Sequence, residues 1–302
     1  MPEAKDLNDM MLFLAVVEAG SFTLAAERTG MPKANLSRKV SRLEHQLGVT
    51  LLERSTRSQH LTEVGKQYLA HCRRIHQELD LANASVSQLI GTPKGQLRVG
   101  ASVAIGQLMI QPKLADFMHQ YPNIDMQLSL TNRRVDLIEE GFDMLIRVGD
   151  LDDSGLIAKR LGSAKRQIYA SPNYLTQCKT IKTVSDLSTC NFLLMSKNHH
   201  TNSCRLQSGQ KNHDIVIKPK LLVDDFFTLK HAVLDGLGIA VLPDYMCQTA
   251  VEKGQLVQVL PGWGMPNVNF YALYPQYRLK IPKVRVFLDF IQTVFSTTLL
   301  AH

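Results

Sequence analysis

The chain has 302 residues, enough for two or three domains, and 45% of them are hydrophobic and 20% charged. This composition is typical of a globular protein and excludes a largely disordered one. No stretch approaches the roughly 18 uninterrupted apolar residues of a membrane span. The N-terminus has no basic segment ahead of an apolar run, so we expect a cytoplasmic protein without membrane association.

The formal net charge of +7 is concentrated near the N-terminus. Residues 28–74 contain ten Lys and Arg side chains and only three acids, so this segment alone carries +7. A basic segment near one terminus favours binding to a polyanion such as nucleic acid. A solvated helix face is the alternative interpretation of any charge run.

The five cysteines are scattered and include no C-x-x-C pair: Cys72, Cys178, Cys190, Cys204 and Cys247. This pattern excludes a disulfide framework and a zinc site and favours reduced, mostly buried thiols, with a redox-sensing thiol as the alternative. The pair His199-His200 has only Cys204 nearby as a further ligand, which favours a surface loop. We expect no metal and no cofactor.

Three helices are predicted in the first 47 residues. Residues 7–19 carry apolar side chains at helical spacing. Ser21 offers an N-cap hydroxyl to a second helix over residues 22–29. Pro32 suits the first position of a third helix that extends to residue 47.

The third helix has an apolar side formed by Leu36, Val40, Leu43 and Leu47 and a polar, basic side. Two short helices, a glycine turn and such a third helix predict a helix-turn-helix, with an ordinary helical bundle as the alternative. Residues 50–52 and 60–61 flank a polar tip and predict a β-hairpin wing. The predicted DNA contacts are Ser21, Thr23, Lys33, Ala34, Asn35, Ser37, Arg38, Arg42, Arg54 and Arg57.

Residues 15–69 resemble the DNA-binding region of LysR-type transcriptional regulators. The matching features, in order, are AVVEAGSFTLAA, SRKVSRLE, LGVTLLER and LTEVG. The resemblance implies a winged helix-turn-helix, a long linker helix and an effector domain similar to a periplasmic binding protein. It also implies tetramers built from two kinds of dimer contact.

Three residues depart from the pattern of these regulators. Thr29 stands where Leu is usual, which is expected to loosen the packing of the first helices slightly. Lys33 and Asn35 stand where Gln and Ala are frequent. These two positions bear on which bases are read, so no target sequence carries over.

Residues 62–90 predict a long helix without proline. Apolar and small side chains recur there at alternating intervals of four and three, at Tyr68, Cys72, Ile75, Leu79, Ala82, Val86 and Leu89. This seam favours pairing with a second chain, whereas packing onto its own domain is the alternative. A paired helix predicts a homodimer or homotetramer that binds double-stranded DNA at pseudo-palindromic half-sites. Residues 91–95 are predicted to form a hinge.

The rest of the chain predicts an α/β fold. Strands over 97–101, 124–130 and 143–149 alternate with helices over 105–121, where Pro112 marks a possible break, and 134–141. A second such unit spans 167–267, with apolar segments at 166–171, 191–196, 215–223 and 238–243 and helices over 226–236 and 244–254. A strand over 267–275 and a helix over 282–296 end the chain.

The predicted domains are the winged helix-turn-helix over 1–61, the linker helix and hinge over 62–94, and the effector domain over 95–302. Within the effector domain, we expect subdomain I to comprise 95–163 and 270–302, and subdomain II to comprise 164–269. The resemblance places the crossings between them near 161–167 and 267–273.

The resemblance also places a ligand cleft between these subdomains. The predicted effector-binding residues are Ala101, Ser102, Val103, Thr131, Asn132, Arg147, Gly149, Asp225 and Phe226. Arg147 favours a small organic anion, and a structural ion pair with Asp143, Asp150 or Asp225 is its alternative. For Ser102 the alternative is a simple helix cap.

The sequence contains none of the motifs G-x-S-x-G, G-x-x-x-x-G-K-[ST], G-x-G-x-x-G or H-E-x-x-H, which disfavours an enzyme and predicts no catalytic residue. A solute-binding transport protein would suit the second half but not the basic first half. The favoured hypothesis is a LysR-type DNA-binding regulator whose promoter binding is modulated by a small-molecule effector.

Overall fold

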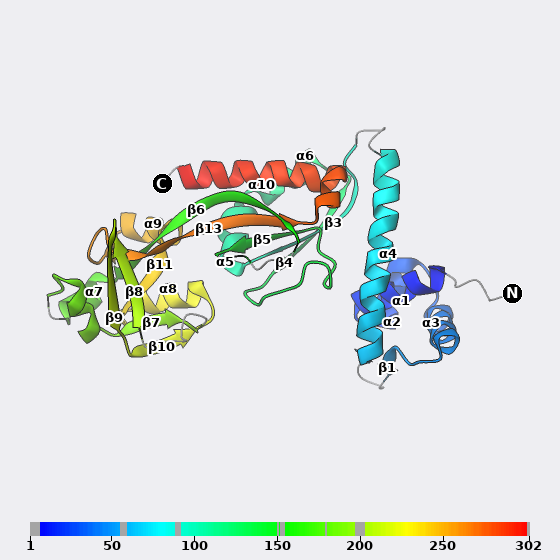
Figure 1. The fold of residues 1–302 in the computed structure, drawn as a ribbon, viewed down its shortest axis with the longest axis horizontal. Helices are drawn as coiled ribbons and strands as arrows, with labels where there is room; N and C mark the ends of the chain where they lie inside the picture. Colours follow the sequence, from blue (N-terminus) through cyan, green and yellow to red (C-terminus); the bar gives the residue numbers. More distant parts are fainter. Residues whose placement is uncertain are drawn as a thin grey trace. The chain divides into compact units, whose positions relative to one another are not determined.

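The computed structural model describes residues 7–54, 59–87, 92–149, 151, 155–178, 180–196 and 203–300. They form two compact units: residues 1–91 with 136–141, and residues 92–135 with 142–302. Figure 1 colours the helices of the first unit blue to cyan. In the described part of the chain, no single helix is both long and apolar enough to cross a membrane, and only one bent pair, residues 7–19 with 22–29, reaches that length and apolar content together.

The first unit contains three short helices, a hairpin and a long helix. Their bounds are α1 Leu7–Ala19, α2 Phe22–Thr29, α3 Lys33–Leu47, β1 Leu52–Arg54, β2 Gln59–Leu61 and α4 Glu63–Ser87. The predicted helices and hairpin are confirmed, except that Pro32 is the N-cap of α3 rather than its first residue. Strands β1 and β2 are antiparallel, with Leu52 opposite Leu61. The hairpin tip at 55–58, including Arg57, lies outside the described residues.

One hydrophobic core holds the first unit together. Its fully buried side chains come from all four helices and the wing, and they include Phe13, Ala25, Leu36, Val40, Leu51 and Cys72. Gly65 of α4 lies so close to the wing that a Cβ there would stand 2.1 Å from the carbonyl oxygen of Leu51. Only glycine permits this approach, which accounts for the glycine in the LTEVG segment.

The predicted seam of α4 is divided. Tyr68, Cys72 and Ile75 pack onto the core of their own unit, which is the alternative that the sequence left open. Leu79 on the next turn is 44% exposed, and Ala82 is exposed as well. The last two seam positions, Val86 and Leu89, have no described side chain. Of the described seam residues, only Leu79 and Ala82 are therefore exposed and available to pair with a second chain.

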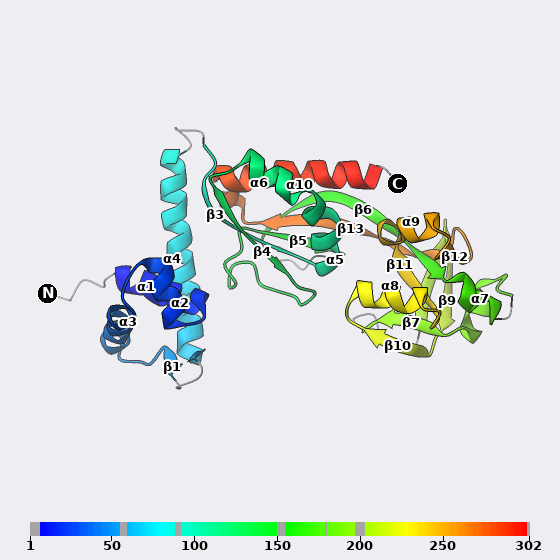
Figure 2. The same cartoon turned by 180° about the vertical axis from the view of Figure 1, so that it is seen from behind.

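The second unit begins with three parallel strands in the order β5-β3-β4, namely β3 Gly95–Ala101, β4 Ile124–Leu130 and β5 Met144–Val148. The helix predicted over 105–121 is interrupted: α5 Val103–Ile105 and α6 Gln111–Gln120 flank a π-helical turn at Gly106–Ile110. Figure 2 shows α6 beside α10 Pro282–Leu300.

The helix predicted over 134–141 is wrong. This segment forms turns, in which the Asp136 carboxylate accepts the backbone N–H groups of Ile138 at 2.8 Å and Glu139 at 2.7 Å. A short carboxylate that binds nearby amides competes with a regular helix.

The later part of the second unit has another parallel set, β10-β7-β11, with bounds β7 Phe192–Met195, β10 Pro219–Val223 and β11 Ile239–Pro243. Around it lie α7 Pro172–Thr176, α8 Phe226–Leu234 and α9 Asp244–Glu252, together with the hairpin β8 Ser203–Ser208 and β9 Lys211–Val216. The apolar segment 215–223 is thus split between β9 and β10, and β8 was not predicted.

Two long strands connect these parallel sets into one sheet. β6 Ile157–Ala170 and β13 Gly264–Tyr274 pair antiparallel with each other. β13 also pairs with β5, and β6 pairs with β11, so both strands pass from one set to the other (Figure 1). The segments predicted to cross, 161–167 and 267–273, lie inside these strands.

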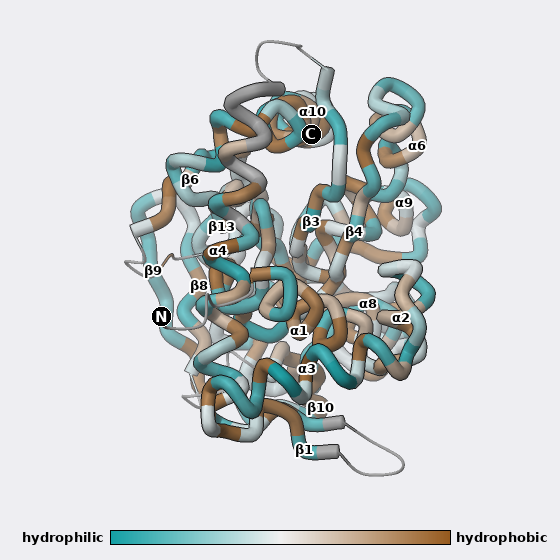
Figure 3. The backbone as a smooth tube through the Cα atoms, turned by 90° about the vertical axis from the view of Figure 1, so that its right-hand side faces the viewer, coloured by the Kyte–Doolittle hydropathy of each residue, from teal (hydrophilic) through white to brown (hydrophobic). Residues whose placement is uncertain are grey.

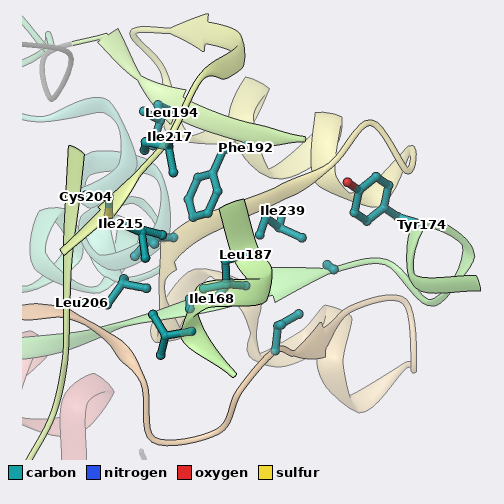
Figure 4. Close-up of a cluster of buried hydrophobic side chains, with 14 residues drawn as sticks. Ile168, Tyr174, Leu187, Phe192, Leu194, Cys204, Leu206, Ile215, Ile217 and Ile239 are labelled. Carbon is teal, nitrogen blue, oxygen red and sulfur yellow. The ribbon is translucent and has the colours of Figure 1, made fainter. Parts of the chain in front are cut away.

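Each parallel set carries its own apolar packing. In Figure 4 the ring of Phe192 points among side chains such as Leu194 of the same strand, Ile215 of β9 and Ile217 just after β9. Figure 3 shows that α3, by contrast, alternates between hydrophobic and hydrophilic residues along its length. The strands are therefore interior elements, whereas α3 has a face available to a partner.

Candidate DNA interface and effector site

Helix α3 presents a polar face opposite its buried stripe. Leu36 and Val40 are completely buried and Leu43 is 4% exposed, which fits the i, i+4, i+7 spacing of one helix face. The predicted DNA contacts on the remaining surface are exposed (Lys33, Ala34, Arg38) or half-buried (Asn35, Ser37). Nη2 of Arg38 donates to Oδ1 of Asn35 one turn earlier, so these two side chains form one polar unit.

The predicted contacts on α2 lie at its start. The Ser21 hydroxyl accepts the backbone N–H of Leu24 at 3.1 Å and so caps the helix, while Thr23 is exposed. Thr29, which departs from the expected family pattern, donates its hydroxyl to the carbonyl of Ala25 at 2.7 Å. The Thr29 hydroxyl therefore has a hydrogen-bond partner within its own helix.

Arg42 occupies a different place from the other predicted contacts. Its Nε lies 2.6 Å from Oδ2 of Asp9 on α1, and Nζ of Lys39 lies 3.3 Å from Oδ1 of the same carboxylate. The Asp9 side chain is fully buried. Arg42 thus joins α3 to α1.

The wing is attached to α3 through a residue that the sequence did not single out. Oε1 of Glu44 accepts the backbone N–H groups of Leu51 at 2.8 Å and Leu52 at 3.0 Å. The side chain of Arg54 and the whole of Arg57 lie outside the described part of the structure.

The predicted effector residues fall into four segments, and three of these, 101–103, 131–132 and 147–149, meet where the parallel strands β3, β4 and β5 end; the fourth contains Asp225 and Phe226. Ala101 is in register with Leu130 and with Ile146, and the N–H of Thr131 donates to the Ala101 carbonyl at 2.9 Å. Gly149 has φ +90, a conformation that favours glycine. Carboxyl ends of parallel strands are the usual ligand-binding edge of such sheets.

Asn132 brings the fourth segment to the same place. Its Oδ1 accepts the N–H of Val103 at 3.2 Å, and its Nδ2 donates to the carbonyl of Asp224 at 3.0 Å. One side chain therefore links the first turn after β3 to the segment that enters α8. Ala104 and Leu108 also pack against apolar side chains of α8 and its neighbours.

Arg147 is half-buried, and its Nη1 donates to the carbonyl of Arg133 at 3.3 Å. The Asp143 carboxylate pairs instead with Arg278 and Lys283, and that of Asp225 caps α8 through the N–H of Thr228 at 2.8 Å. Asp150 is not described.

The remaining predicted residues have mixed positions. Ser102 is the N-cap of α5 by backbone conformation, yet its side chain makes no capping hydrogen bond. Phe226 and Phe227 are both partly buried and pack against the same core cluster. Gly236 has φ +81, which agrees with a backbone turn.

Four cysteine thiols have raised pKa values and are therefore mostly protonated at neutral pH. Burial raises the pKa of Cys72 and Cys247 to about 12. Burial also raises the pKa of Cys190 and Cys204 to about 11. This result favours inert thiols over redox sensing at these positions.

Two families of known proteins match this chain. Residues 7–66 match the bacterial regulatory helix-turn-helix protein, lysR family, and residues 91–296 match the LysR substrate binding domain. An HTH-type transcriptional regulator of Xanthomonas campestris is 40% identical over 292 residues, covering 95% of this chain and 85% of that protein.

Two solved full-length structures are also similar. The Vibrio cholerae virulence activator AphB is 30% identical with a TM-score of 0.62, over 95% of this chain and 98% of its own. CrgA of Neisseria meningitidis is 31% identical with the same TM-score of 0.62, again over 95% and 98%. These relatives are transcriptional regulators rather than enzymes, and the chain belongs to the LysR family of transcriptional regulators, with a DNA-binding helix-turn-helix domain and an effector-binding domain.

Proposed function

We propose that this regulator binds a pseudo-palindromic operator in the cytoplasm as a homodimer or homotetramer, and that a small organic anion modulates the binding. The observation that carries the proposal is the polar surface of α3, where exposed Arg38 lies opposite the buried stripe and exposed Lys33 begins the helix. A helix of this kind fits the major groove, where base edges are distinguishable.

Arg38 is the strongest candidate for reading a base. It is exposed near the start of α3 and lies beside Asn35. A guanidinium that contacts a base edge contributes about 1 to 3 kcal/mol of discrimination. Arg38→Ala should therefore relax selectivity at one operator position, whereas a phosphate contact would weaken all duplexes alike.

The direct test is fluorescence anisotropy of the purified protein on the duplex upstream of its own gene, with random duplex as control and a series of salt concentrations. We expect the upstream duplex to bind tighter than random duplex by about three orders of magnitude or more. Equal and weak binding to both would place the operator elsewhere, and no binding at any salt would refute the DNA-binding proposal.

Oligomerisation is supported by Leu79. A large apolar side chain that is 44% exposed on a mostly polar helix suits pairing with the same face of a second chain. Two paired chains would set two α3 helices on one duplex, and their two-fold symmetry predicts inverted half-sites.

The effector site is supported by the donors at the strand ends. The hydroxyls of Ser102 and Thr131 and the guanidinium of Arg147 come from the ends of three neighbouring strands, which suits a carboxylate. We expect a panel of small mono- and dicarboxylates to include one that raises the Tm of the wild-type protein, and Arg147→Gln to abolish that shift.

The matched control is Arg205→Gln, which removes an exposed arginine paired with Asp214 at 2.8 Å on the β8–β9 hairpin. It should leave the carboxylate-induced shift unchanged. If no carboxylate shifts the wild-type Tm, or if Arg147→Gln retains the full shift, the effector is not an anion bound at Arg147.

A further inference from the structure

A buried carboxylate fastens the recognition helix to α1. The Asp9 side chain has no exposed surface, and each of its oxygens faces a cation from α3: Oδ2 faces Nε of Arg42 at 2.6 Å, and Oδ1 faces Nζ of Lys39 at 3.3 Å. Removing the cations would leave the buried carboxylate without compensation, which is costly in the interior.

The two cations occupy one flank of α3. Lys39 and Arg42 are three residues apart and so lie on neighbouring turns of the same side, between the buried stripe and the outward position of Arg38. Their side chains are 34% and 49% exposed. The double contact therefore sets the rotation of α3 about its own axis relative to α1, and with it the direction in which Lys33 and Arg38 point.

The same contact changes the charge available to DNA. Burial raises the pKa of Asp9, but hydrogen bonds and charges from Arg42 and Lys39 outweigh burial and hold this pKa below its ordinary value. The carboxylate is thus ionised at neutral pH and offsets part of the positive charge of α3. Two of the ten cations in residues 28–74, Lys39 and Arg42, are engaged by this buried carboxylate.

We propose that Asp9 is a positioning residue for operator recognition, which fixes the rotation of α3 and withdraws Lys39 and Arg42 from the DNA phosphates. This inference rests on the DNA contacts proposed for α3. It reassigns Arg42 from a direct DNA contact to an anchor that acts through Asp9.

The test uses the full-length protein and a duplex that the wild-type protein selects from a random library. Binding of Asp9→Asn to the selected duplex and to random duplex is measured by anisotropy over a salt series. We expect selectivity to fall by about tenfold or more. On random duplex, the slope of log K against log salt should steepen by about 1 to 2, because each released cation that meets a phosphate adds about 0.9.

A loss of folded protein alone would weaken binding to both duplexes together and leave the slope unchanged. The matched control is Glu78→Gln, which removes one negative charge from an exposed position of α4 in the same unit. It should change neither selectivity nor slope. Unchanged selectivity in Asp9→Asn would overturn the proposal.

Arg42→Gln provides a second test that holds even if Asp9→Asn does not fold. We expect it to lose selectivity without changing the salt slope on random duplex. An arginine that contacts phosphate would instead make the slope shallower by about 0.9 on substitution, and that outcome would overturn the proposal. If the selection enriches no sequence, the proposed operator recognition itself fails, whereas an enriched duplex that Asp9→Asn and Arg42→Gln still select refutes only the role of Asp9.

Discussion

Replacing Asp143 with asparagine tests the most deeply buried ion cluster of the second unit. Asp143 and Arg278 are 3% exposed and Lys283 is 6% exposed. The carboxylate lies 2.5 Å from Nη1 of Arg278 and 3.7 Å from Nζ of Lys283, and it accepts the N–H of Arg98 at 2.9 Å. It therefore connects the beginnings of β3 and β5 with the segment that leads into α10.

The expected loss of stability follows from this burial. Asparagine retains the shape and one acceptor oxygen but removes the charge that compensates two cations. Breaking a buried ion pair from one side costs about 3 to 5 kcal/mol, a large part of the 5 to 15 kcal/mol typical of a whole protein. With a urea dependence of about 2 to 3 kcal/mol per molar, the unfolding midpoint should fall by about 1 to 2.5 M.

The assay is urea unfolding followed by the fluorescence of Trp263, which is the single tryptophan of the chain and lies in the second unit. Asp116→Asn serves as control, because its partner Lys113 is 3.7 Å away and both side chains are largely exposed. Adding Arg278→Met to Asp143→Asn should recover part of the loss, since it removes a buried cation. A midpoint within about 0.3 M of the wild type for Asp143→Asn would refute the reasoning.

Three further predictions concern the first unit and the thiols. The pKa of Asp9 is lowered in the folded protein, so its contribution is complete above the ordinary value of 3.8 and is lost as pH falls through the folded pKa. The stability difference between wild type and Asp9→Asn should thus shrink in acid, as thermal unfolding between pH 7 and pH 3 would show; a constant difference would contradict this. Leu79→Glu should reduce the oligomer mass in light scattering, whereas Val64→Glu, on an equally exposed side chain outside the seam, should not. Alkylation of the native protein at pH 7.5, mapped by mass spectrometry, should modify Cys178 first, because burial raises the pKa of the other four thiols; labelling of Cys72, Cys190, Cys204 or Cys247 ahead of Cys178 would contradict this expectation.

The elements that could be predicted from the sequence are those encoded by local periodicity and caps. Helices α1 to α3 follow from apolar spacing, and Ser21 caps α2 as its hydroxyl predicts. The helix predicted over 134–141 is wrong because the acids and apolar residues there fit a helical pattern, whereas the Asp136 carboxylate accepts nearby backbone N–H groups instead. The lengths of β6 and β13 could not be predicted either. Each strand crosses between two parallel sets and pairs with different strands along its length, so its sequence shows no single pattern of burial.

The positions of the candidate sites could be predicted from the sequence, but the ion pairs beside them could not. The ends of β3, β4 and β5 meet as the α/β alternation implies. The partner of Arg42 was not accessible, because Asp9 lies 33 residues away on another helix. The one local signal was an acid at position 9 within an otherwise apolar helix face, which requires a cation from elsewhere if it is buried.

Among the described residues, each unit thus contains one buried carboxylate that pairs with two cations: Asp9 with Lys39 and Arg42, and Asp143 with Arg278 and Lys283. Buried ion pairs add little net stability compared with apolar packing of the same volume. We therefore infer that these pairs serve to fix the orientation of the elements that they join. Apolar side chains tolerate a small rotation of one helix against another, whereas a carboxylate held between two cations at 2.5 to 3.7 Å does not. In a regulator, such ion pairs would preserve the orientation of α3 and the attachment of α10 to β3 and β5. Replacing both partners with apolar residues should therefore preserve stability better than replacing one, while losing the orientation that the pair imposes.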